Sequence, residues 1–255
     1  MTKSTITTQK QLLGAWCTIP NSFSVELVST LPMDFVVLDM QHGLITFADL
    51  ISCLQVAERR GKHTVVRIAT GEFGLAQRVL DAGSLDLIFP MINNVDDAVR
   101  AVASSKYPPI GSRSYGPVRS RFVVGPDPVA ANNRVRCLVQ IETRESFENI
   151  KAIIGVSGVD GTYIGPADLA LSFGFELGVQ NSRLDEIIEE IKQTTLAAGL
   201  TSCIHTTNGK SARRCLDNGF SMVSIGSDAI WLRNGYGKQF ADASKQSFEE
   251  NVGFY

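Results

Sequence analysis

Residues 135–169, VRCLVQIETRESFENIKAIIGVSGVDGTYIGPADL, contain the pattern that decides the fold. Two short apolar runs, Val135–Glu142 and Val159–Gly165, flank a helix-like stretch, Arg144–Ile154. A run such as CLVQI is apolar on both faces, which is typical of parallel strands that are covered on each side of a sheet. The segment therefore predicts two parallel strands joined by a helix.

The same alternation extends over almost the whole chain. Six further apolar runs are found at Leu12–Ile19, Asp34–Met40, Thr64–Ile68, Asp86–Met91, Leu200–His205 and Met222–Gly226. Other helix-like stretches are Phe47–Arg60, Glu72–Ala82, Val95–Ser105 and Arg183–Ala198. Eight strands with helices between them in 255 residues predict one (β/α)8 TIM barrel over residues 1–255. An open doubly wound α/β sheet is the alternative, but no GxGxxG motif follows the first strand.

Two segments depart from this alternation. Residues 106–134 form the longest irregular stretch and include PPIGSRSYG. Because a loop of that length in a compact barrel usually has a function, we expect it to cover the catalytic face. Residues 228–255 are expected to form a C-terminal helix and tail.

Composition limits the classes of function. Hydrophobic residues make up 44% of the chain and charged residues 20%, which allows a substantial core. Lys and Arg number 24 against 26 Asp and Glu, and this balance argues against a nucleic-acid binder. No apolar run approaches the roughly 18 residues of a membrane span, and the polar start is unlike a secretory signal. The five scattered cysteines are typical of reduced thiols, so we expect a cytoplasmic protein without a membrane partner.

Carboxylates follow two neighbouring strands near the end of the quoted stretch. Glu142 ends one strand and shares a face with Gln140, since alternate strand residues point the same way. Asp168 lies in the turn after the next strand. Two carboxylates, together with water and substrate oxygens, suit a hard cation such as Mg²⁺ or Mn²⁺. Alternatively, each carboxylate caps the helix that follows its strand.

A histidine and an arginine stand at the ends of two earlier strands. His42 is a candidate acid–base group, or else a hydrogen-bonded loop histidine. Arg67 interrupts an apolar strand, where a charge needs an anion. That anion is a substrate carboxylate, a developing oxyanion or a buried partner such as Asp39. Asp81 either ends its helix or orients His42, whereas His205 is given no role.

Two other chemistries find less support in the sequence. Every lysine lies outside the C-terminal ends of the strands, so no Schiff-base lysine is expected and carbanion chemistry would require a metal ion. The turn SIGSDA, with Ser227 and Asp228, is similar to a phosphate-binding helix start. It has no glycine-rich partner loop after the seventh strand, and no nucleotide site is expected.

Several motifs in the chain also carry a family resemblance. LDMQHG, VVRIA, LDAG, FPM, KYPPIGSRS, LVQIETRE and GVDGTYIGPADL occur in this order between about Gly14 and Asp228. Together they resemble the metal-dependent (class II) pyruvate aldolases of the HpcH/HpaI aldolase/citrate lyase superfamily. Aldolases for 4-hydroxy-2-oxoheptanedioate and 2-dehydro-3-deoxyglucarate belong to this family, and malyl-CoA lyases are more distant relatives.

The resemblance implies how cofactor and substrate are bound. Glu142 and Asp168 would be the ligands of a divalent metal ion, which is Mg²⁺, Mn²⁺ or Co²⁺. Gln140 and the turn residues Gly165, Ala167 and Asp168 would hold the pyruvate half of the substrate. The small-molecule partners would be a 2-oxo acid and an aldehyde.

The resemblance also implies a reaction. A 4-hydroxy-2-oxo acid would be cleaved reversibly to pyruvate and an aldehyde through a metal-bound pyruvate enolate, in aromatic or sugar-acid catabolism. His42 would be the acid–base residue, Asp81 would raise its basicity, and Arg67 would stabilise the transition state. The implied assembly is a homo-oligomer, a trimer or hexamer, with the C-terminal helix exchanged between subunits.

Two departures from the family pattern concern the aldehyde half. Gln41 stands where many relatives have glutamate, and the loop reads GSRSYGP where many relatives read GxRG. Alternative functions are a CoA-thioester lyase of the malyl-CoA or citramalyl-CoA type and a phosphosugar isomerase or epimerase. The first needs a basic groove, for which the candidates are Arg113, Arg119 and Arg121. The second would rest on the SIGSDA turn.

Overall fold

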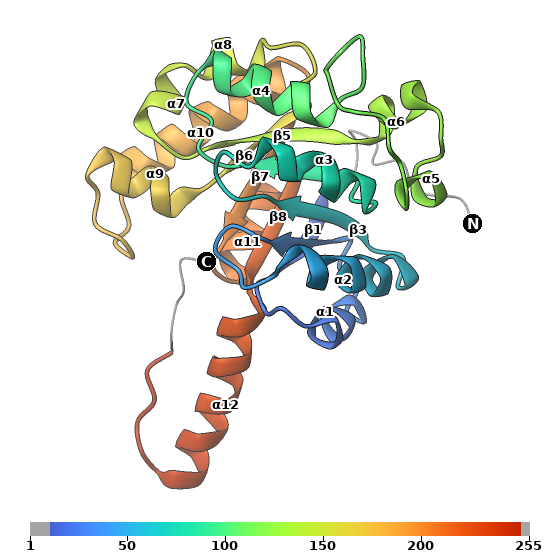
Figure 1. The fold of residues 1–255 in the computed structure, drawn as a ribbon. Coiled ribbons are helices and arrows are strands. Elements are labelled where there is room, and N and C mark those ends of the chain that lie inside the picture. The colour runs from blue at the N-terminus through green and yellow to red at the C-terminus, as the bar shows by residue number, and fades with distance from the viewer. Residues whose placement is uncertain (1–10, 251–255) are drawn as a thin grey trace.

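The computed structural model describes residues 11–250, and its central feature is a closed barrel of parallel strands (Figure 1). The strands are β1 Leu12–Cys17, β2 Phe35–Asp39, β3 His63–Arg67, β4 Asp86–Phe89, β5 Arg136–Ile141, β6 Gly161–Ile164, β7 Thr201–Thr206 and β8 Met222–Ser227. Each strand pairs with the next in the sequence, and β8 pairs with β1 to close the barrel. The predicted (β/α)8 TIM barrel is therefore confirmed.

Helices surround the barrel and connect its strands. They are α1 Ser22–Ser29, α2 Phe47–Arg59, α3 Phe73–Asp81, α4 Val95–Ser105, α5 Ser120–Val123, α6 Pro128–Arg134, α7 Arg144–Glu148, α8 Ile150–Ile154, α9 Pro166–Phe173, α10 Ser182–Ala197, α11 Gly209–Asp217 and α12 Asp228–Ser244. The predicted helix over residues 144–154 is divided at Asn149, which ends α7 and precedes α8. Local sequence fixes other ends: Thr46 and Asp49 form a reciprocal capping box at the start of α2.

Two apolar layers make up the core. One fills the barrel and consists of Leu12, Trp16, Phe35, Val37, Val65, Ile88, Leu138, Tyr163, Cys203 and Met222. The other lies between the strands and the surrounding helices. Gly14 makes room inside the barrel, because a Cβ atom there would lie 2.4 Å from the Phe35 ring. Burial of one such large side chain contributes roughly 1.5–3 kcal/mol.

Residues 106–134 lie at the N-terminal end of the barrel, which corrects the expectation that they cover the catalytic face. They lead from the end of α4 to the start of β5, and they include α5 and α6. Arg113 forms an ion pair with Asp81, and Arg119 forms one with Glu58. The two carboxylates lie in the last turns of α3 and α2. Helices in a barrel return the chain to the starts of the strands, so their last turns lie opposite the catalytic end. Figure 1 shows α5 and α6 on the opposite side from α9.

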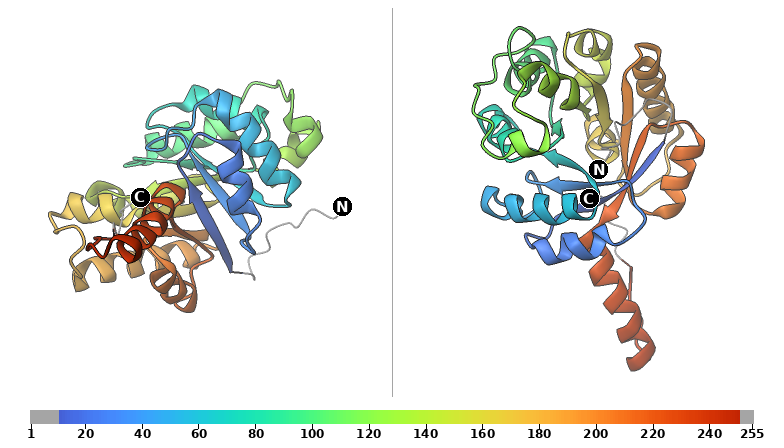
Figure 2. Two further views of the ribbon diagram at one scale, coloured as in Figure 1. Left: turned by 90° about the horizontal axis from the view of Figure 1, so that it is seen from below. Right: turned by 90° about the vertical axis from the view of Figure 1, so that its right-hand side faces the viewer.

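Helix α12 projects away from the barrel (Figures 1 and 2). Its exposed apolar residues are Trp231, Leu232, Tyr236 and Phe240. The predicted C-terminal helix is thus present, while residues 251–255 of the predicted tail fall outside the described residues. Among residues 11–250, no helix has the length and apolar character needed to cross a membrane.

Candidate active site

Arg67 and Asp39 form a buried ion pair at the C-terminal ends of β3 and β2. The register of the two strands places them opposite each other, with Arg67 Nε 2.8 Å from Asp39 Oδ1 and Nη2 2.6 Å from Oδ2. Arg67 is only 2% exposed, and its guanidinium lies 4.7 Å from the centre of the Trp16 ring. Burial alone would raise the pKa of Asp39, but hydrogen bonds and the charge of Arg67 lower it. Asp39 is therefore a partner of Arg67, which is one of the alternatives that the sequence allows.

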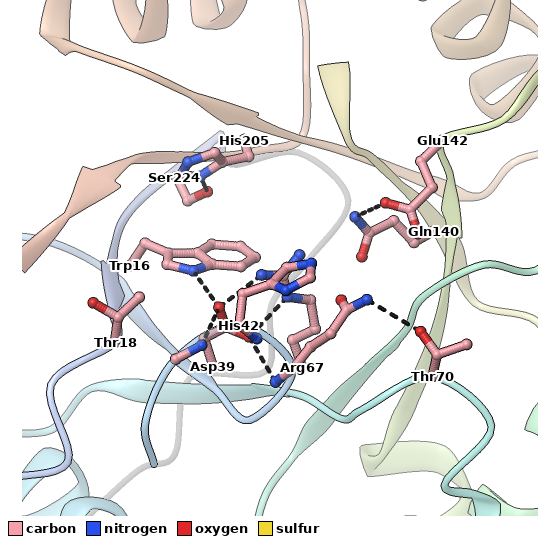
Figure 3. A network of polar contacts seen from close by, with 12 residues as sticks. Trp16, Thr18, Asp39, His42, Arg67, Thr70, Gln140, Glu142, His205 and Ser224 are labelled. Carbon is pink, nitrogen blue, oxygen red and sulfur yellow. Dashed lines mark hydrogen bonds and ion pairs between the residues drawn. The ribbon is translucent and has the colours of Figure 1, made fainter. Parts of the chain in front are cut away.

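The Asp39 carboxylate also shapes the turn that carries His42. It accepts hydrogen bonds from the backbone N–H groups of Gln41 at 3.0 Å, His42 at 3.4 Å and Gly43 at 3.1 Å. Gly43 is required in this turn because a Cβ atom would lie 2.2 Å from the Asp39 carbonyl oxygen. His42, Asp39 and Arg67 consequently belong to one polar network (Figure 3).

Glu142 and Asp168 come together where β5 ends and α9 begins, as the sequence predicts. Glu142 Oε1 accepts a hydrogen bond from the Met91 backbone N–H at 2.7 Å, and its other oxygen accepts one from the Gln140 amide. Burial raises the pKa of Glu142 to about 7, and the charge of Asp168 and a hydrogen bond between the two side chains act in the same direction. In the site, therefore, the charge of Asp168 disfavours ionisation of Glu142.

The carboxylate pair has the donor chemistry of a divalent-cation site. Thr143, and not Glu142, caps α7, so the helix-cap alternative does not account for Glu142. Residues 11–250 contain no group of three or more His, Cys, Asp or Glu side chains that could hold a metal ion. Two carboxylates completed by substrate and water oxygens suit Mg²⁺. The Oε1 atom of Gln140 is buried and has no hydrogen-bond partner in the structure. A bound ligand would supply that partner.

A pocket of about 290 Å³ lies between Arg67, Gln140 and Asp168. Its lining residues are Trp16, Arg67, Gln140, Tyr163, Gly165, Pro166, Ala167, Asp168 and His205. Gly165 is needed for close packing, because a Cβ atom there would lie 2.8 Å from both Gln140 Nε2 and Glu142 Oε2. The structure thus gathers Arg67, Gln140, Gly165, Ala167 and Asp168 around one small cavity.

Asp81 is the predicted site residue that the structure does not place in this cluster. It ends α3 at the N-terminal end of the barrel and forms an ion pair of 2.6 Å with Arg113. His42 lies at the other end, after β2. The predicted role of Asp81 in orienting His42 stays a prediction, because the two residues lie at opposite ends of the barrel within one chain.

Three residues of the pocket region escaped sequence reasoning. Met91 has a backbone φ of 55°, which is rare for a residue other than glycine, and this conformation presents its N–H to Glu142. Trp16 is recognisable in the sequence only as an aromatic residue in a barrel strand. His205 lines the cavity from the end of β7, where the sequence assigned it no role.

Three residues on which the alternative functions depend, Asp228, Arg113 and Arg119, form hydrogen bonds or ion pairs within the chain. The Asp228 carboxylate at the start of α12 accepts hydrogen bonds from Thr18 at 2.8 Å and from Ser24 at 3.0 Å. A carboxylate at this helix start disfavours phosphate, because like charges repel. Arg113 and Arg119 bind carboxylates at the N-terminal end of the barrel, away from the pocket.

Comparison with known proteins identifies relatives of this chain. The family described as HpcH/HpaI aldolase/citrate lyase matches residues 12–235. A 4-hydroxy-2-oxo-heptane-1,7-dioate aldolase of Salmonella paratyphi C (strain RKS4594) is 34% identical over 237 residues, which cover 91% of this chain and 90% of the relative.

Solved structures extend the comparison. An HpcH/HpaI aldolase/citrate lyase family protein from Burkholderia cenocepacia J2315 has a TM-score of 0.83 at 25% identity, covering 93% of this chain and 95% of that one. A citrate lyase β subunit from M. tuberculosis, complexed with oxaloacetate and magnesium, shares the fold with a TM-score of 0.58 at 14% identity, covering 87% of this chain and 94% of that one. The chain therefore belongs to the HpcH/HpaI aldolase/citrate lyase family.

Proposed function

We propose that the protein is a divalent-metal-dependent aldolase that cleaves a 4-hydroxy-2-oxo acid reversibly to pyruvate and an aldehyde. The observation that carries this proposal is the buried Glu142 carboxyl group beside Asp168, which lines one pocket with Arg67. The carboxylates could hold a cation, and the guanidinium supplies a fixed positive charge. The 4-hydroxy-2-oxo-heptane-1,7-dioate aldolases among its relatives support a substrate of this class.

Glu142 and Asp168 would hold the ion, which is Mg²⁺, Mn²⁺ or Co²⁺, and the bound ion would polarise the 2-oxo group as a Lewis acid. Gln140 would orient the pyruvate half from one side of the cavity. From the other side, the backbone around Ala167 and Asp168 lies in the first turn of α9, whose start has no side-chain cap. Unpaired N–H groups at a helix start favour a carboxylate, so this turn would bind the substrate's acid group.

His42 and Arg67 would perform the bond-breaking step. His42 would remove the proton from the 4-hydroxyl group, and the aldehyde forms as the C3–C4 bond breaks. The electron pair of that bond passes to the pyruvate half, whose developing oxyanion Arg67 would stabilise. A proton added at C3 then completes pyruvate.

Asp81 supports a role for a second copy of the chain. Because Asp81 and His42 lie at opposite ends of one barrel, contact between them requires a neighbouring subunit. Val118 and Phe122 on the segment that binds Asp81 are 79% and 82% exposed, as interface residues are in a separated subunit. We therefore include in the proposal a homo-oligomer, a trimer or hexamer, in which a neighbour provides Asp81 and α12 is exchanged.

Deuterium exchange into pyruvate tests the enolate-forming part of the proposal without any choice of aldehyde. Metal-stripped protein would be incubated with pyruvate in deuterated water, with and without Mg²⁺, Mn²⁺ or Co²⁺, and the methyl signal followed by NMR. We expect metal-dependent exchange that is lost in His42→Ala and Glu142→Ala. Glu145→Ala, an exposed glutamate in the first turn of α7, is the matched control and should keep it. Folded protein that shows no exchange with any of these ions would contradict the proposal.

The intersubunit role of Asp81 has its own test. His42→Ala and Asp81→Ala chains would be assembled separately and then together, and exchange measured in each sample. Mixed assemblies can combine a native His42 with a native Asp81 across an interface, so we expect exchange that exceeds that of either variant alone. A monomer in analytical ultracentrifugation, or no recovery in confirmed mixed assemblies, would overturn this role.

A further inference from the structure

His205 lies where the described pocket meets a second, outer groove. It lines the pocket beside Trp16 and Arg67, and it also lines a cavity of about 970 Å³ between the segments that follow β6 and β7. Polar residues from those segments, including Glu176, Asn181 and Arg214, line the outer groove. Figure 3 shows His205 over Trp16, on a different side of the pocket from Glu142.

One ring nitrogen of His205 has a hydrogen-bond partner and the other has none. Nδ1 lies 2.9 Å from Ser224 Oγ, which accepts a hydrogen bond of 2.6 Å from the Tyr163 hydroxyl. Since Ser224 receives the Tyr163 proton, its own hydroxyl proton can be donated to Nδ1. The ring proton then resides on Nε2, which is buried and has no hydrogen-bond partner in the structure.

The surroundings fix both the charge and the orientation of the ring. Burial and the nearby positive charge of Arg67 lower the pKa of His205 to about 3, so the ring is neutral at physiological pH. The ring centre lies 4.6 Å from that of Trp16. His205 is 8% exposed, and an N–H donor buried without a partner is unfavourable unless a ligand completes it.

We propose that His205 is a specificity-determining residue that donates a hydrogen bond from Nε2 to a hydroxyl group on the aldehyde half of the substrate. This inference rests on the proposed aldolase function. Glu142 and Asp168 would fix the pyruvate half, so the remaining half extends past His205 toward the outer groove. A neutral donor suits an uncharged hydroxyl oxygen, and Glu176 and Arg214 give the groove charges of both signs rather than an anion site.

The test compares two acceptors of similar size in aldol addition to pyruvate. Glycolaldehyde carries a hydroxyl group where propanal carries a methyl group. A site that hydrogen-bonds a substrate hydroxyl rejects the analogue that lacks it, so we expect kcat/KM to favour glycolaldehyde by about 10- to 100-fold. In His205→Phe, which keeps a ring over Trp16 but removes the donor, this preference should fall to within a few-fold of unity. His205→Gln, which restores an N–H donor, should recover part of it.

Other measurements keep the two proposals separable. Ser224→Ala removes the partner of Nδ1 and should weaken the same preference, which provides a second variant if His205→Phe does not fold. No deuterium exchange into pyruvate in the wild-type protein would refute the aldolase function itself. Normal wild-type exchange with no preference for glycolaldehyde, or with a preference that persists in folded His205→Phe and Ser224→Ala, would overturn the role of His205.

Discussion

Both ends of the barrel bury carboxyl groups, but the charges of the neighbouring groups differ between the two ends. At the N-terminal end, Asp86 accepts hydrogen bonds from Arg136 at 2.9 Å and lies 2.7 Å from His63. Burial alone would raise the pKa of Asp86, but the positive charges of Arg136 and His63 outweigh it and hold the pKa well below its usual range. At the C-terminal end, burial and the neighbouring Asp168 carboxylate raise the pKa of Glu142 to about 7.

The two ends therefore differ in role: the Asp86 carboxylate stabilises the fold, whereas the Glu142–Asp168 pair is suited to bind a ligand. The carboxylate of Asp86 is balanced by cations of the same chain, so nothing further is needed there. At the Glu142–Asp168 pair, the positive charge of Arg67 acts on Glu142 but does not outweigh burial and the second carboxylate. Buried polar atoms of Gln140 and His205, which line the same pocket as Asp168, have no hydrogen-bond partner in the structure. The ion partners of Asp86 therefore neutralise the aspartate at one end, whereas the two carboxylates meet at the end where barrel enzymes bind substrates.

Removal of Arg136 should produce the largest effect on stability. Arg136→Ala leaves the fully buried Asp86 with His63 as its remaining charged partner. Removal of one member of a buried ion pair lowers the free energy of unfolding by about 3–5 kcal/mol. Urea denaturation at neutral pH measures this loss, and a change below about 1 kcal/mol would show that the pair is not important for the fold.

The matching substitution at the other end should chiefly affect the reaction. Arg67→Ala removes the donor proposed to stabilise the oxyanion, so pyruvate exchange per folded molecule should fall by about 10²–10³, or roughly 3–4 kcal/mol. Arg136→Ala is the control, since it also removes an arginine paired with a buried aspartate but should retain the exchange rate of its folded fraction. A decrease of less than tenfold in Arg67→Ala would mean that Arg67 acts only as the structural partner of Asp39.

The smallest expected effect is the pH dependence that Glu142 gives to metal-free protein. Its folded pKa of about 7 lies above the ordinary value of 4.5, so between these pH values the folded state retains a proton that the unfolded state has lost. The free energy of unfolding should therefore decrease as pH rises from 5 to 8, by an amount on the order of 1–3 kcal/mol.

Denaturation of wild-type and Glu142→Gln protein at several pH values, without metal, isolates this contribution. The variant should lose the downward slope, because its amide does not titrate, and a divalent ion should reduce the slope in the wild-type protein. Equal slopes in the two metal-free proteins would show that the Glu142 carboxyl titrates normally. Asp86, whose pKa is lowered, contributes in the opposite sense: its stabilisation is lost as pH falls below its ordinary value.

Much of the fold is readable from the sequence because it depends on local patterns. Doubly apolar runs give buried parallel strands, and the structure shifts their predicted ends by only a few residues, as in Phe35–Asp39 against the predicted Asp34–Met40. The gathering of Arg67, Gln140 and Asp168 also follows from sequence, because parallel barrel strands all end on one side. The sequence predicts the wrong end of the barrel for residues 106–134, because the preceding helix, α4, already returns the chain to the other end.

The barrel, the common direction of its strands and the polar residues at the strand ends all follow from the pattern of residue types. Which of these polar groups have partners depends instead on how the strands and loops pack together. Strand register makes Asp39 the partner of Arg67, and the positive φ of Met91 turns a backbone N–H toward Glu142. Ser224 binds one nitrogen of His205 and leaves the other open. Such pairings depend on distances between residues far apart in the chain, and a periodic pattern of residue types contains no information on those distances.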